Sequence, residues 1–285
     1  MTEKVSIYAF ADEAANDIVG QIAAMKKNGL NGLEIRGVGG ANVMSLSDKK
    51  AKEIRQALDD NGLRVWSIGS PIGKIGIRDP FAPHLDSFRR SLELANLLGA
   101  SVIRLFSFYI PAGEDPAVYR DEVMERMAKM ADEGRDSAAV LCHENEKGIY
   151  GDNADRCLDL LTSVPGIKAV FDPANFVQCG EDTLRAWAML APHVYYMHIK
   201  DADKNGMVVL PGTGEGNVPA ILSSYLKKGG RAMTLEPHLT VFTGLNALER
   251  EGERSGIGVF SSREEAFDTA ACELKKIVTS LGYGL

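Results

Sequence analysis

The chain has 285 residues, of which 45% are hydrophobic, 25% charged and 7% aromatic. These proportions are ordinary for a folded globular protein and exclude a disordered, collagen-like or coiled-coil chain. The formal net charge of −7 argues against nucleic acid as a partner and against binding to acidic membranes. The sequence contains no apolar run of about 18 residues and no secretory signal, and its four cysteines lack the spacing of a zinc cluster or a disulfide framework. We therefore expect a cytoplasmic protein.

Eight short runs rich in β-forming residues recur along the chain. They are Ser6–Phe10, Gly32–Ile35, Arg64–Ile68, Val102–Phe106, Ala139–His143, Lys168–Phe171, Tyr195–Ile199 and Met233–Leu235. Most of these runs are continuously apolar, which is typical of parallel strands that are covered on both faces.

Segments with helical periodicity lie between most of the strands, and many of them end at a glycine, which adopts the left-handed conformation at little cost. Their apolar residues span Ile18–Met25, Ile54–Leu58, Phe88–Leu98, Val123–Met130, Leu184–Ala191, Ile221–Tyr225 and Phe267–Val278. Strands that alternate with helices form βαβ units. We predict an α/β protein with a closed (β/α)8 barrel, or TIM barrel, as a single domain over residues 1–285; a doubly wound open sheet is the alternative.

A long connection follows the eighth strand, at about residues 239–260. Its length exceeds that of most connections in compact domains. We expect it to cover the active site or to form an oligomer contact.

Four consecutive strands end in a carboxylate or an imidazole. Glu144 follows strand five, Asp172 follows strand six, His198 lies near the end of strand seven, and Glu236 follows strand eight. The C-terminal ends of barrel strands form the active site, so these side chains are expected to converge. Taken singly, such an Asp is more often a helix N-cap and such a His more often a core residue. Their joint occurrence at four successive strand ends is what favours a shared site.

Three carboxylates packed together repel one another unless a cation lies among them. We therefore predict one divalent metal ion per chain. A ligand set rich in oxygen with one nitrogen favours Mn²⁺ or Co²⁺, with Mg²⁺ and Zn²⁺ as alternatives.

At these residues the chain resembles the xylose isomerase-like TIM barrel superfamily of sugar phosphate and keto-sugar isomerases and epimerases, the D-tagatose 3-epimerase-like proteins among them. The motifs are His143-Glu144-Asn145, Phe171-Asp172-Pro173, Met197-His198-Ile199-Lys200-Asp201 and Leu235-Glu236-Pro237-His238. The resemblance implies that Glu144, Asp172, His198 and Glu236 hold the metal. It also implies that Glu144 and Glu236 are the catalytic acid/base pair in a proton transfer through an enediolate.

The function implied by this resemblance is a metal-dependent isomerase or epimerase (EC class 5) that acts on a keto-sugar or sugar phosphate, with a small carbohydrate as its partner. A lyase or dehydratase that acts on an oxidised sugar, inosose or glycoside at the same site is the alternative. An abasic-site endonuclease would need more histidines and a basic groove, and a non-catalytic sugar-binding barrel would not need intact ligands. Homo-oligomers are common in the family, so a homo-oligomer is an expectation by analogy only.

Further side chains near the strand ends are candidates for binding the substrate. They are Asn175, His143, His238, Glu34, Arg36 and Arg104. Glu34 and Arg36 could equally form a layer of ion pairs, and Arg104 could equally be a structural partner for an anion. The glycine loop Gly212–Gly216 is expected to be a lid, with a phosphate-binding loop as the alternative. Lys200-Asp201 matches the family pattern without a role assigned from the sequence.

Overall fold

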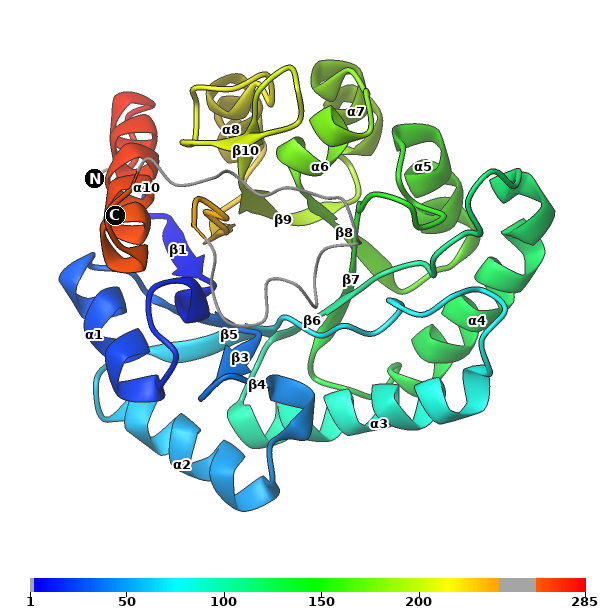
Figure 1. The fold of residues 1–285 in the computed structure, drawn as a ribbon, viewed down its shortest axis with the longest axis horizontal. Coiled ribbons are helices and arrows are strands. Elements are labelled where there is room, and N and C mark those ends of the chain that lie inside the picture. The colour runs from blue at the N-terminus through cyan, green and yellow to red at the C-terminus, as the bar shows by residue number, and fades with distance from the viewer. Residues whose placement is uncertain (1–2, 241–259) are drawn as a thin grey trace.

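Eight parallel strands close into a barrel in the order β1-β12-β9-β8-β7-β6-β5-β2 (Figure 1). The computed structural model describes residues 3–240 and 260–285, so almost all of the long loop predicted at 239–260 lies outside the described residues. The barrel strands are β1 (Ser6–Ala9), β2 (Gly32–Ile35), β5 (Arg64–Ile68), β6 (Val102–Leu105), β7 (Val140–Glu144), β8 (Ile167–Phe171), β9 (Val194–Ile199) and β12 (Ala232–Leu235). The predicted closed barrel is confirmed over the open sheet.

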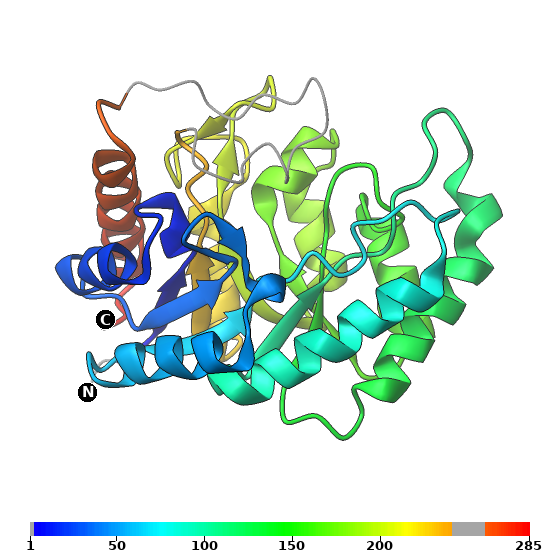
Figure 2. The same cartoon turned by 60° about the horizontal axis from the view of Figure 1, so that its bottom comes forward.

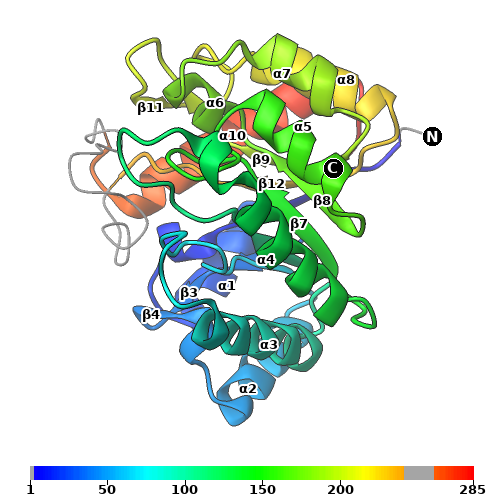
Figure 3. The ribbon, with the colours of Figure 1, turned by 90° about the vertical axis from the view of Figure 1, so that its right-hand side faces the viewer.

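A ring of helices surrounds the barrel (Figures 1 and 3). These helices are α1 (Ile18–Lys27), α2 (Asp48–Asp59), α3 (Phe81–Leu98), α4 (Arg120–Glu133), α5 (Ala154–Ser163), α7 (Thr183–Leu190), α8 (Val218–Lys227) and α10 (Arg263–Ser280). A shorter helix, α6 (Pro173–Gln178), directly follows β8. Sequence reasoning predicts neither α5 nor α6. Helix α6 has only six residues, too few for a periodic pattern. The buried residues of α5 (Ala154, Cys157, Leu160 and Leu161) do recur at helical spacing, so this helix could have been predicted.

Several short elements lie in the connections. Two hairpins pair β3 (Gly37–Val38) with β4 (Ala41–Asn42) and β10 (Asp201–Ala202) with β11 (Val208–Val209). Three 3₁₀ turns are η1 (Ala11–Glu13), η2 (Val43–Ser45) and η3 (Pro116–Tyr119). Within residues 3–240 and 260–285, none of the helices combines the length and apolar character that a membrane crossing requires.

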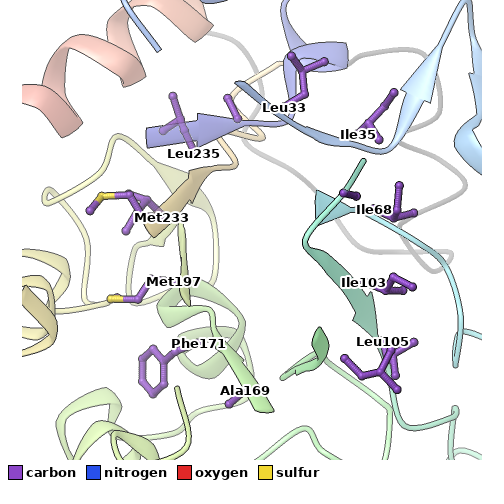
Figure 4. Close-up of a cluster of buried hydrophobic side chains, with 14 of the residues drawn as sticks. Leu33, Ile35, Ile68, Ile103, Leu105, Ala169, Phe171, Met197, Met233 and Leu235 are labelled. Carbon is purple, nitrogen blue, oxygen red and sulfur yellow. The ribbon is translucent and has the colours of Figure 1, made fainter. Parts of the chain in front are cut away.

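The main core lies between the strands and the helices. Figure 4 shows side chains such as Leu33, Ile103 and Met233 pointing away from the barrel axis, toward the helices. Successive residues of a strand point to opposite faces, so the intervening side chains point into the barrel. Ile103 and Leu105 therefore belong to the outer core, whereas Arg104 between them faces the interior.

The barrel interior has an apolar part and a charged part. Val102, Cys142, Val170 and Tyr196 form a separate buried cluster, and the ring of Trp66 stands edge-on to Tyr196 at 6.0 Å. Two residues further along these strands, toward their C-terminal ends, the interior side chains are charged or imidazole groups. Figure 2 shows the strands pointing toward the upper end of the view, where the loop that carries β10 and β11 rises above the barrel. The charged part therefore lies at the end of the barrel where active sites of this fold are built.

Candidate metal centre

Glu144, Asp172, His198 and Glu236 converge at the C-terminal end of the barrel. One ligand atom from each lies within 4.8 Å of the ligand atoms of the others. All four side chains are buried. They come from β7, β8, β9 and β12, which are successive neighbours in the barrel, so the order of the strands alone brings them to one place.

The imidazole of His198 is at the centre of this cluster. Its Nδ1 atom lies 3.0 Å from Oε1 of Glu144 and 3.1 Å from Oε2 of Glu236. Burial disfavours the charged ring, but the negative charges of Glu144 and Glu34 outweigh burial and raise the pKa of His198 well above its usual value. The ring of Phe10 packs edge-on against the imidazole at 5.3 Å and gives the site an apolar wall.

The two oxygens of Asp172 have different partners. Oδ1 accepts a hydrogen bond of 3.0 Å from the backbone N–H of Asn175 and so caps helix α6. Oδ2 faces the cluster and lies 3.0 Å from Nζ of Lys200. Burial raises the pKa of Asp172 to about 7, and the ammonium group of Lys200 opposes this rise.

A guanidinium group and a side-chain amide contact the carboxylate of Glu144. Its Oε2 lies 3.2 Å from Nη1 of Arg104, whose guanidinium packs over the rings of Phe10 and Phe106. The side-chain amide of Asn175 donates to Oε1 at 3.3 Å. Burial would raise the pKa of Glu144, but the positive charges of His198 and Arg104 lower it to about 2.

Glu236 connects the cluster to a second acidic group at the end of β1. Arg36 donates to Oε1 of Glu236 at 3.1 Å, to Oε1 of Glu13 at 3.1 Å, and to both oxygens of Asp12 at 3.0 Å. Glu13, Glu236 and His238 also have ligand atoms within 4.8 Å of one another. The first cluster offers four ligands, all buried, whereas this second group offers three, so the first cluster is the better candidate for a metal ion.

The donor atoms of the first cluster fit a divalent cation. Oε2 of Glu144, Oδ2 of Asp172 and Oε2 of Glu236 are buried. Among the described residues they have ion-pair neighbours (Arg104, Lys200 and His198) but no partner with the geometry of a hydrogen bond. Buried carboxylate oxygens in such a group need positive charge to offset their mutual repulsion and loss of hydration. Three carboxylate oxygens and one imidazole nitrogen suit a hard or borderline divalent ion.

The family model for the xylose isomerase-like TIM barrel matches residues 22–249, most of the chain. The chain belongs to this family. No curated protein matches it in sequence. Membership agrees with the resemblance inferred from the strand-end motifs.

Several solved structures share the fold at low sequence identity. The probable 3-DHS dehydratase AsbF from Bacillus anthracis is 17% identical, with a TM-score of 0.72 over 97% of this chain and 98% of that chain. A xylose isomerase-like TIM barrel protein from Mycobacterium smegmatis in complex with magnesium is 17% identical, with a TM-score of 0.72 over 99% of each chain. The 3-keto-D-glucoside 4-epimerase YcjR from E. coli is 15% identical, with a TM-score of 0.70 over 96% of this chain and 100% of that chain.

Five of the six substrate-binding candidates from the sequence contact residues of the cluster. Asn175, Arg36 and Arg104 contact the carboxylates of the cluster, and Nε2 of His238 lies 3.3 Å from Oε1 of Glu236. Glu34 contacts His198 from the side away from Glu144 and Glu236. Of the two interpretations open for Arg36 and Arg104, the ion pairs are present in the structure.

His143 is the candidate that the structure does not bring to the cluster. It precedes Glu144 in β7 and therefore points to the opposite face of the strand. Its Nε2 atom lies 2.9 Å from Oγ of Ser107, and burial lowers the pKa of its ring to about 4. The geometry supports a structural role for His143 rather than contact with a substrate.

Sequence reasoning missed two charged residues near the cluster, Asp12 and Glu13, and noted Lys200 without assigning it a role. Lys200 is buried, with Nζ 3.0 Å from Asp172 and 3.6 Å from Glu236. The rule that points to the four candidate ligands also points here, because Lys200 directly follows β9 and the turn η1, with Asp12 and Glu13, begins two residues after β1 ends.

The glycine loop Gly212–Gly216 is anchored by Asp201. Its carboxylate accepts backbone hydrogen bonds of 2.9 Å from Gly212, 3.0 Å from Gly214 and 2.9 Å from Gly216. A phosphate would need these same N–H groups, so the alternative of a phosphate-binding loop is wrong for this structure. The contacts also give Asp201 a role that the sequence had left unassigned.

Proposed function

We propose that this protein is a metal-dependent isomerase or epimerase that acts on a keto-sugar or sugar phosphate. The observation that carries the proposal is the cluster of three buried carboxylates and one imidazole at the C-terminal end of a xylose isomerase-like barrel. Neighbours in this fold include a named epimerase and a probable dehydratase, so the fold is compatible with proton-transfer chemistry on oxidised sugars.

Glu144, Asp172, His198 and Glu236 would hold one divalent ion, with Mn²⁺ or Co²⁺ favoured and Mg²⁺ or Zn²⁺ as alternatives. The ion would supply Lewis acidity that lowers the free energy of an enediolate. Lys200 and Arg104 keep the carboxylates charged and in place, because each lies within 3.2 Å of one ligand carboxylate. These contacts support a preorganised site rather than one that forms on binding.

Glu144 and Glu236 are the proposed acid/base pair. Their oxygens lie 3.0 Å and 3.1 Å from Nδ1 of His198, and β8 and β9 separate their strands in the barrel. A substrate carbon between them would have one carboxylate on each face. One carboxylate would remove the proton next to the carbonyl group, and the other would return a proton to the opposite face.

A lyase or dehydratase is the second candidate. It would begin with the same removal of a proton and end with loss of a β leaving group, for which Lys200 is a nearby proton donor. A fold neighbour named as a probable dehydratase favours keeping this candidate.

The experiment is incubation of the Mn²⁺-loaded protein in deuterated water with free ketoses, ketose phosphates, inososes and 3-keto-glycosides. NMR and mass spectrometry would locate any deuterium. Deuterium at C2 or C3 with no loss of water is the expected result for an isomerase or epimerase, whereas an unsaturated product indicates a lyase.

The matched control is the Glu144→Gln variant, which keeps the shape of the side chain and removes the base. Deuterium incorporation should fall at least 100-fold in this variant. Absence of both exchange and elimination across the whole panel would contradict the proposed function, as would unchanged exchange in Glu144→Gln.

A further inference from the structure

Glu34 contacts His198 on the side of the imidazole that faces away from Glu144 and Glu236. Its Oε2 atom lies 3.1 Å from Nε2 of His198, while Nδ1 of the same ring faces the carboxylates of the cluster. Glu34 and His198 are both fully buried. The two nitrogens of one imidazole therefore have separate partners, Glu34 at Nε2 and the candidate metal centre at Nδ1.

Two hydroxyl groups fix the other oxygen of Glu34. The phenol of Tyr196 donates to Oε1 at 2.9 Å, and Oγ of Ser67 donates to the same atom at 3.1 Å. Tyr196 and Ser67 are fully buried as well. With both donors on Oε1, the Oε2 atom is left to accept a hydrogen bond, and the donor that reaches it is the Nε2–H of His198.

This arrangement determines which nitrogen of His198 keeps its proton when the ring binds a metal ion. A neutral imidazole has one N–H and one lone pair, and the hydrogen bond at one nitrogen sets the role of the other. Without a metal ion, the charged ring donates from both nitrogens, from Nε2 to Glu34 and from Nδ1 to the carboxylates of the cluster. A cation bound by the cluster would take the place of the proton on Nδ1, while Nε2–H stays with Glu34. A carboxylate behind a ligand histidine also makes the ligand nitrogen more basic.

We propose that Glu34 is a positioning residue that orients His198 and fixes its tautomer for binding the divalent ion. This inference rests on the proposed function, and it replaces the expectation that Glu34 binds the substrate. Glu34 is fully buried in the barrel interior behind His198, so the imidazole lies between it and the other ligands. A chain of hydrogen bonds thus leads from Tyr196 and Ser67 through Glu34 to His198.

The test is the metal affinity of the Glu34→Gln variant, measured with Mn²⁺ alone by isothermal titration calorimetry. The neutral amide is a weaker acceptor for Nε2–H and can present an N–H₂ group to the ring. We expect the Kd to rise about 10- to 100-fold. A second readout is ¹⁵N NMR of the Zn²⁺-loaded protein, in which wild-type His198 should show one protected Nε2–H and Glu34→Gln should lose it.

Two further variants separate this role from general destabilisation. Glu34→Asp keeps the charge but shortens the side chain, so it should also weaken metal binding and expose the Nε2–H. Glu93→Gln is a control on the exposed face of α3, where the carboxylate pairs only with Arg90 among the described residues, and it should bind Mn²⁺ as the wild type does. If Glu34→Gln does not fold, Glu34→Asp decides the outcome by the same two readouts.

The outcomes distinguish this inference from the proposed function. Wild-type metal affinity and an unchanged Nε2–H signal in both Glu34 variants would overturn the role of Glu34 while leaving the metal centre intact. A wild-type protein that binds neither Mn²⁺ nor Zn²⁺ would overturn the metal centre and this inference together. Weaker binding with a lost Nε2–H signal in a folded variant supports the inference.

Discussion

In Asp172 and Glu236, one carboxylate oxygen contacts the surrounding protein and the other faces the cluster. Asp172 caps α6 with Oδ1 and faces the cluster with Oδ2, so one side chain can serve both as a helix cap and as a candidate ligand. Glu236 pairs with Arg36 through Oε1 and with His198 through Oε2. One oxygen of each group is fixed by a protein donor, which holds the other in place with little conformational freedom.

At this scale we predict the effect of Glu236→Gln. The change removes one proposed base and one negative charge next to the metal, while the amide keeps the size of the side chain. Turnover should fall about 10²- to 10⁴-fold. Steady-state kinetics on the substrate identified by deuterium exchange would measure this fall, with circular dichroism to confirm the fold.

A surface glutamate provides the comparison for this prediction. Glu133 pairs with Arg89 on the outside of the barrel, so Glu133→Gln should retain wild-type turnover. Normal turnover in Glu236→Gln would mean that Glu236 is not the base, even if the four side chains do hold a metal.

The conformation of the connection after β9 depends on one side chain, that of Asp201. Lys200 and Asp201 are adjacent, yet Lys200 points to the cluster and Asp201 holds the glycine loop. A Cβ added at Gly214 would lie 2.3 Å from the backbone oxygen of Ala202, so the loop requires glycine for its close approach to the chain. The strand that carries the candidate ligand His198 is therefore followed directly by the residue that anchors the glycine loop.

We predict that Asp201→Asn destabilises this element. The carboxylate accepts backbone hydrogen bonds on both oxygens, and an asparagine would turn an N–H₂ group toward at least one backbone donor. Leaving a buried donor unsatisfied costs about 1–3 kcal/mol in the free energy of unfolding. Urea denaturation would measure the loss, and hydrogen exchange should show faster exchange at Gly212, Gly214 and Gly216.

The exposed Lys204 in the same loop provides the control, because Lys204→Ala removes no buried hydrogen bond. Its free energy of unfolding should stay within about 0.5 kcal/mol of the wild type. Equal stability of Asp201→Asn and wild type would show that other contacts hold the loop.

At the scale of the whole molecule, closure of the barrel brings the acidic strand ends together. β1 pairs with β12, and α10 lies beside α1, where Lys27 contacts Glu264 and Asp268 (Figure 1). This closure places Asp12 and Glu13 beside Glu236 through Arg36. The unfolded chain does not hold these carboxylates together, so a cation that binds the cluster favours the folded barrel.

We therefore predict that a divalent ion stabilises the protein and that a chelator reverses this effect. Saturation with Mn²⁺ at about 100 times its Kd should add about 2.7 kcal/mol to the free energy of unfolding. Differential scanning calorimetry with Mn²⁺, with Co²⁺ and after EDTA treatment would show the change as a shift in Tm. A Tm that is indifferent to both metal and chelator would contradict the metal centre.

The positions of the barrel strands and of the four clustered side chains followed from the sequence because they depend on local patterns. A strand buried on both faces is continuously apolar, and parallel strands of one barrel all end at the same side. Glu144 and Asp172 could thus be expected to meet from their places at two neighbouring strand ends. The helix α6 is too short to show a periodic pattern. The helix α5 does show one on its buried face, and sequence reasoning overlooked it.

By itself the sequence determined the barrel, its family and the residues that could share a metal ion. That His143 points away from Glu144 follows already from the alternation of side chains along a strand. Only the tertiary structure decided that Glu34 lies behind His198 and that Arg36 joins Glu13 to Glu236. The reason is physical: strand order brings ends together regardless of packing, whereas contacts inside the barrel depend on register. Glu34 and His198 are 164 positions apart in the chain, and no local pattern encodes which atoms of two such residues meet.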